Sequence, residues 1–161
     1  MTVILSSVAF WAPVTFIRVG DDLQPEKVTF RARFKRLKKS ERVALDHRIA
    51  AAGLLPQTRQ LMQEKIDSPD TEEHTRDFLR ARLAATPTND AELLNEVLVD
   101  WDLKDHRGDF VPYTPAIRAE LEEDLDGLEG CMAAAFMKAM GVIFDPAEQE
   151  KNSAAQSATT S

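Results

Sequence analysis

The chain has 161 residues, of which 43% are hydrophobic and 29% are charged, with a formal net charge of −7. This composition is that of a globular protein, and a chain of this length buries enough surface to fold without a disulfide or metal staple. The single cysteine, Cys131, excludes an internal disulfide framework. The sequence contains no apolar run of 18 residues, so we predict no transmembrane helix.

Charge is distributed unevenly along the chain. Residues 27–48 hold nine Lys and Arg against two acidic residues, a net charge of +7, and the remainder carries −14. A segment of this kind predicts a basic face that meets an acidic partner. The partner could be a nucleic acid, an acidic protein or the acidic part of another copy of the chain.

The first 37 residues predict a β-hairpin. Residues 1–17 are fairly apolar, but a secretory signal has basic residues before its apolar run, and the first basic residue here is Arg18. We therefore interpret them as an N-terminal strand or arm. Residues 14–19 are β-branched and aromatic, and residues 27–37 alternate between apolar and basic. We expect the two segments to pair across a loop at 20–26, as a hairpin over residues 13–37, with helices covering its apolar face.

Helical patterns follow from residue 40 to about 145. Ser40 is expected to cap the first helix and Gly53 to end it, and a short helix follows Pro56. The pair Ser68-Pro69 predicts the cap and first residue of a third helix that buries Phe78, Leu79 and Leu83. Residues 88–90 cap a fourth helix, which carries Leu94, Val97 and Leu98.

Two further helices are expected near the end of the chain. Thr114 and Pro115 read as the cap and first residue of one, and Gly127 or Gly130 breaks it. The last helix has one apolar stripe. Its members are Leu128, Met132, Ala135, Phe136, Ala139, Met140 and Ile143. Residues 148–161 are rich in Ser, Ala, Thr and Gln, and we predict a flexible tail.

Residues 101–113 predict two short extended arms around a turn, in which Gly108 has a positive φ. Trp101 supplies a large apolar area to this joint, and Pro112 stiffens the exit toward Tyr113. The acids at 100, 102, 105 and 109 begin like a calcium loop. Lys104, Asp105 and Val111 then stand where such a loop needs a ligand, a glycine and a closing glutamate. Solvated turn acids are the better interpretation.

No sequence pattern marks a catalytic, cofactor or metal site. The acids between residues 120 and 126 read as a polar helix face, and Cys131 beside the apolar stripe reads as a buried thiol. The basic residues 31–42 satisfy the charge requirement of a nucleic-acid surface. Phe30 and Phe34 lie on the opposite face of the strand, however, so the basic face lacks a stacking platform and a protein partner is favoured. We expect partner contacts at Arg31, Arg33, Lys35, Lys38, Lys39, Phe136 and Met140.

The order of motifs over residues 78–152 resembles one family. A helix runs into "LLNEVLVDWD", a turn follows in "KDHRGDFVPYT", and a later helix holds "AAAFMKA" before "KN". This order resembles the tail assembly chaperones of long-tailed, siphovirus-type bacteriophages. The matching positions are Trp101, Asp105, Gly108, Val111, Pro112, Tyr113, Thr114, Ala135, Phe136, Lys151 and Asn152. The segment "FKRL" at 34–37 is also similar to the family's opening, and the chain departs from it at residues 54–86.

The resemblance implies a protein without enzymatic activity or cofactor. Such chaperones bind the tape-measure protein, keep its long apolar helices soluble and recruit tail-tube subunits in the host cytoplasm, without entering the mature virion. The complementary charges predict a homo-oligomer. We expect an α+β fold: one domain over residues 1–147, with the hairpin at 13–37, a mainly helical part at 40–145 and a flexible tail at 148–161. A small nucleic-acid-binding accessory protein that uses residues 31–42 is the alternative.

Overall fold

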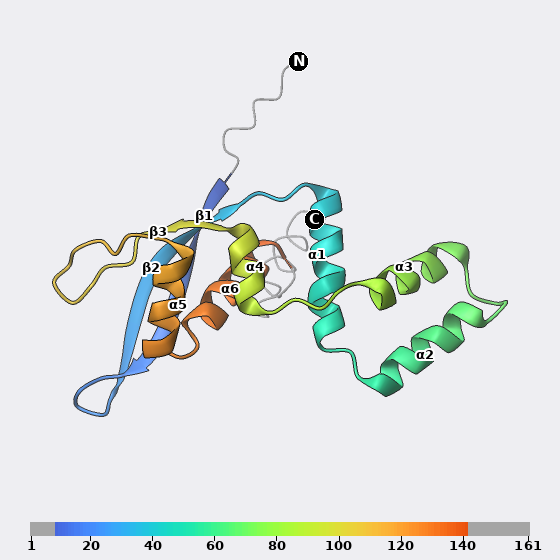
Figure 1. The fold of residues 1–161 in the computed structure, drawn as a ribbon, viewed down its shortest axis with the longest axis horizontal. Helices are drawn as coiled ribbons and strands as arrows, with labels where there is room; N and C mark the ends of the chain where they lie inside the picture. The colour runs from blue at the N-terminus through green and yellow to red at the C-terminus, as the bar shows by residue number, and fades with distance from the viewer. Residues whose placement is uncertain (1–8, 142–161) are drawn as a thin grey trace, which may run out of the picture. The chain divides into compact units, whose positions relative to one another are not determined.

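The computed structural model describes residues 9–141 and has an α+β fold. The described part contains a three-stranded antiparallel sheet of order β1-β2-β3 and six helices (Figure 1). The elements are β1 (Ala9–Val19), β2 (Pro25–Lys35), α1 (Lys39–Ala52), α2 (Pro56–Asp67), α3 (Glu73–Ala84), α4 (Asp90–Val97), β3 (Leu98–Trp101), α5 (Pro115–Asp124) and α6 (Leu128–Ala139). The α+β expectation is therefore confirmed. The expected flexible tail at 148–161 and the stripe residue Ile143 lie outside the described residues.

The chain groups into two compact units. The helical unit is Leu37–Leu93, and the sheet unit comprises residues 9–36 and 94–141 of the described chain. Two compact units can still unfold as one cooperative body. A single domain over residues 1–147 therefore stays a prediction.

The sheet unit is built on a hairpin, as predicted, but its strands run over residues 9–19 and 25–35 and not over 13–37. β1 pairs with β2 in a regular antiparallel register from Ala9 opposite Lys35 to Val19 opposite Pro25. The even-numbered residues 10–16 of β1 and 28–34 of β2 face a core to which α6 contributes Leu128, Met132, Ala133 and Phe136. The rings of Phe34 and Phe136 are 5.3 Å apart at its centre. Burial of these alternating residues holds the register, because a slip of one residue would expose them all.

The third strand is a correction to the sequence prediction. Leu98 belongs to β3 and not to the preceding helix, which ends at Val97. β3 pairs with β2, placing Leu98 opposite Phe34 and Trp101 opposite Ala32. Leu98 and Trp101 are both buried. Contact with the hairpin therefore outweighs the helical spacing of Leu94, Val97 and Leu98.

Two helix starts in the helical unit also differ from the prediction. The N-cap of α1 is Lys38, whose backbone N–H donates to the Glu41 carboxylate, so Ser40 lies inside the helix. α3 starts at Glu73 and not after Ser68. The Arg76 guanidinium donates to the carbonyls of Ser68 and Thr71, which holds residues 68–72 as a turn. The expected helix end at Gly53 and start at Pro56 are confirmed.

Phe78 was predicted to be buried and is half-exposed. Leu79 takes the buried position of α3, and Phe78 lies beside it against His47 of α1, with 5.0 Å between the two ring centres. The Arg82 guanidinium lies 4.7 Å from the Phe78 ring and donates to Asp46 and to Nδ1 of His47. Arg82 thus connects α3 to α1 inside the helical unit.

Candidate functional site

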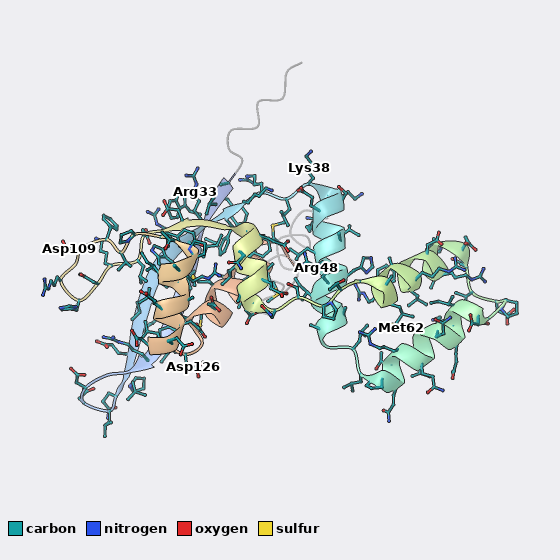
Figure 2. All side chains as sticks on the ribbon, viewed as in Figure 1. Arg33, Lys38, Arg48, Met62, Asp109 and Asp126 are labelled. Carbon is teal, nitrogen blue, oxygen red and sulfur yellow. The ribbon has the colours of Figure 1, made fainter. Side chains whose placement is uncertain are left out.

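One face of the hairpin carries the basic residues and is open to solvent. We define the open face as the odd-numbered residues 11–19 of β1 and 27–35 of β2. They are Trp11, Pro13, Thr15, Ile17 and Val19 on β1, and Lys27, Thr29, Arg31, Arg33 and Lys35 on β2. Cross-strand pairs set an apolar or neutral residue of β1 against a basic or neutral residue of β2. The open face therefore has an apolar strip along β1 beside a basic strip along β2. Figure 2 labels Arg33 of the basic strip.

Trp11 is the residue that sequence reasoning missed on this face. It lies opposite Arg33, and 42% of its surface is exposed. The Arg31 and Arg33 guanidinium carbons lie 5.2 and 5.9 Å from its ring centre, which are cation–π distances. The hairpin register would have identified Trp11. It extends β1 back to Ala9 and places position 11 on the same face of the sheet as positions 31 and 33.

Arg31 is also held in place by Asp102, the residue that directly follows β3. Asp102 accepts hydrogen bonds from the backbone N–H and from Nε of Arg31, the latter at 2.7 Å. Desolvation alone would raise the pKa of Asp102, but the hydrogen bonds and charge of Arg31 outweigh it and lower that pKa. The Arg31 side chain stays 62% exposed, so it is oriented without being covered.

The other expected contact residues do not share the open face. Lys38 and Lys39 are exposed at the start of α1, in the helical unit. Phe136 is buried against Phe34 and serves the core, so it has no surface to offer a partner in this conformation. Met140, just after α6, is half-buried.

The turn motif folds as one joint. Trp101 Nε1 donates to the Val111 carbonyl at 2.8 Å, and its ring meets the Tyr113 ring edge-on at 4.9 Å. An isolated antiparallel β-bridge between Lys104 and Phe110 joins the two extended arms on either side of the turn, in agreement with the prediction. Gly108 has a φ of +86°, as expected. Pro112 is exposed in the segment that leads from the turn to α5.

Asp105 closes the turn at the tip of this joint. Its carboxylate accepts from the backbone N–H groups of Arg107 and Asp109, and its own backbone pairs with Asp109 and Gly108. The hydrogen bond from Asp109 is the main reason that the pKa of Asp105 is lowered. The acid is therefore a structural element of an Asx-type turn.

Arg118 ties the joint to the helices, and no sequence pattern indicated it. Only 3% of Arg118 is exposed. Its guanidinium donates to Glu129 of α6 at 2.7 Å, to Asn95 of α4 at 2.6 Å and to the Tyr113 hydroxyl at 3.1 Å. Thr114 caps α5 by accepting from the Ile117 N–H, as predicted. One buried cation thus joins three helices of the sheet unit to the turn.

Asp100 and Glu122 also accept hydrogen bonds from backbone groups. Asp100 accepts from the Trp101 N–H. Glu122, near the end of α5, accepts from the N–H groups of Gly127 and Glu129 and so caps α6. Among residues 9–141, no group of three or more His, Cys, Asp and Glu side chains is arranged to hold a metal ion. Burial, together with the nearby Glu122 charge, raises the pKa of the Cys131 thiol.

Comparisons of the chain with protein-family models, with curated proteins and with solved structures find no match. Within the described residues, every helix is too short or too polar to cross a bilayer.

Proposed function

We propose that this protein is a tail assembly chaperone of a long-tailed bacteriophage. It binds the tape-measure protein, keeps that protein soluble and recruits tail-tube subunits during tail assembly. It works in the host cytoplasm by binding alone, without catalysis or a cofactor, and is left out of the finished virion.

The joint at residues 101–118 is the observation that supports this proposal. Several residues that carry the resemblance in the sequence contact one another: Trp101 bonds to Val111 and meets the Tyr113 ring edge-on, while Gly108 permits the turn that Asp105 closes. Their roles are architectural, since each fixes backbone geometry between α4 and α5. These residues of the resemblance therefore act together as one structural unit, which is what supports the proposal.

Co-expression tests the proposal. The partner is the very long, helix-rich protein expected from the neighbouring downstream gene. With the chaperone present, this protein should appear in the soluble fraction and co-purify with it. Precipitation of the partner beside a folded chaperone would refute the proposal.

A nucleic-acid-binding accessory protein is the second candidate, and Trp11 is the observation in its favour. The sequence argument against it was that the basic face has no stacking platform, and Trp11 lies on that face between Arg31 and Arg33. A labelled single-stranded oligonucleotide would then bind with an affinity that falls steeply with salt. Loss of this binding in Trp11→Ala would favour the second candidate.

A further inference from the structure

The two strips of the open face differ in what they attract. Ile17 and Val19 are 66% and 70% exposed, so the β1 strip continues from Trp11 as a line of solvent-facing apolar groups. The β2 strip beside it carries Lys27, Arg31, Arg33 and Lys35. Exposed apolar groups that adjoin charged groups of one sign are typical of a protein-binding surface.

We infer that the open face binds an acidic amphipathic helix of a partner protein, laid along the two strands. Alternate residues of a strand are about 6.6 Å apart, and residues four apart on a helix are about 6 Å apart. Three carboxylates at i, i+4 and i+8 therefore come level with Arg31, Arg33 and Lys35. The apolar side of the same helix lies over Trp11, Pro13 and Ile17.

The dimensions of the face set the length of that helix. From Trp11 to Val19 the strand extends about 26 Å, which is the length of about 17 helical residues. A helix is about 10 Å wide and two strands lie about 4.8 Å apart, so a single helix covers both strips. Trp11 is the expected anchor of the interface. Covering this half-exposed tryptophan between two arginines should contribute more binding free energy than covering any other residue of the open face.

A protein helix fits this face better than a nucleic acid does. Nucleic acids bind through phosphate contacts and base stacking, and neither uses Ile17 or Val19. In addition, Asp102 is paired with Arg31 and Asp100 lies opposite Arg33, so part of the positive charge is already balanced. The inference rests on the proposed function, for which it specifies the chemistry of the tape-measure segment that the chaperone holds.

The experiment uses the full chain and three probes. The first is an 18-residue synthetic helix with a Leu/Ala stripe and Glu at three positions four residues apart. The second replaces these Glu by Lys, and the third is an oligo(dT) of 18 nucleotides. Binding is followed by tryptophan fluorescence, with Trp11→Phe to show that the signal arises at position 11. The Glu peptide should bind the wild-type chain at least about tenfold more tightly than the Lys peptide does.

Variants at exposed positions keep the test independent of folding. Ile17→Asp and the double variant Lys27→Glu/Lys35→Glu should each weaken binding of the Glu peptide by about tenfold or more. The double variant should gain binding of the Lys peptide. The matched controls Leu61→Asp in α2 and Arg107→Glu in the turn, both exposed, should leave binding unchanged.

Each outcome decides the inference. Equal binding of the two peptides, unchanged binding in the open-face variants, or preference for the oligonucleotide would overturn it. The same variants co-expressed with the tape-measure protein separate this failure from failure of the proposed function. If wild type and open-face variants keep the tape-measure protein soluble equally well, the chaperone proposal survives and the assigned surface does not.

Discussion

Arg118 of α5 and Glu129 of α6 form an ion pair of 2.7 Å whose side chains are only 3% and 13% exposed. Burial removes most of the hydration of both ions, so the pair is sustained by its geometry and by the further bonds of Arg118 to Asn95 and Tyr113. The turn at residues 101–113 and the helices that pack against it therefore share one buried ion pair.

Replacing either partner should destabilise the fold strongly. Arg118→Met leaves the largely buried Glu129 carboxylate without its cation, and removal of one partner of a buried pair typically costs about 3–5 kcal/mol. Urea denaturation should show the loss as a lower midpoint. Arg80→Met is the matched control, because Arg80 pairs with Glu73 and Asp77 on an exposed helix surface and should cost less than about 1 kcal/mol. Equal effects of the two substitutions would contradict a central role for Arg118.

The two tryptophans should behave in opposite ways. Trp101 is 4% exposed, and its truncation to alanine should cost about 3–5 kcal/mol of unfolding free energy. Trp11 is half-exposed on an edge strand, so Trp11→Ala should change that free energy by less than about 1 kcal/mol while reducing partner binding. Denaturant melts and pull-downs on both variants test this contrast. An unchanged melt with lost binding for Trp101→Ala would move Trp101 from the joint to the partner interface.

Asp105 should make the turn sensitive to acid. Its folded pKa is lowered from the ordinary 3.8, chiefly by the Asp109 N–H, so its contribution is full above pH 3.8 and disappears as the pH falls through the lower folded pKa. The difference in stability between wild type and Asp105→Ala should therefore shrink below pH 3.8. Asp109→Ala keeps the backbone bonds to Asp105 and is the matched control. A difference that is constant with pH would exclude the charged form of Asp105 as the source.

Features set by local chemistry were predictable from the sequence. The alternation at 27–37 predicted the hairpin, the Thr114-Pro115 pair predicted the start of α5, and Gly108 predicted the left-handed position of the turn. In each case the deciding contacts lie within a few residues, or in a strand pairing that a short loop enforces.

The remaining features depend on contacts between distant residues. Arg118 appears in the sequence as one more charged residue of an acidic helix, and its burial follows only from Asn95 and Glu129 reaching it from other helices. Ser68-Pro69 is a sequence typical of a helix start. The Arg76 guanidinium donates to the Ser68 and Thr71 carbonyls, however, and α3 begins only at Glu73. Likewise, Trp11 joins the basic strip only once β1 is paired to its full length.

Self-association should depend on salt. Residues 27–48 carry +7 and the rest of the chain −14, so a basic surface of one copy can meet an acidic surface of another, such as the acids near the end of α5. Contacts of this kind join unlike surfaces, head to tail, and lead to rings or short spirals. Sedimentation velocity at tens of micromolar protein should show oligomers at low salt and smaller species in about 0.5 M salt, where the Debye length is only a few ångströms.

Charge reversal gives the sharpest form of this test. The triple variant Glu120→Lys/Glu123→Lys/Asp124→Lys changes exposed acids of α5 and keeps Glu122, whose carboxylate caps α6. If α5 is the acidic surface, the variant should remain monomeric at low salt and keep the wild-type melting temperature to within a few degrees. The control Glu64→Lys, on exposed α2, should assemble as the wild type does. A wild-type chain that sediments as a monomer at both salt concentrations would exclude electrostatic self-association and leave the open face to a different protein.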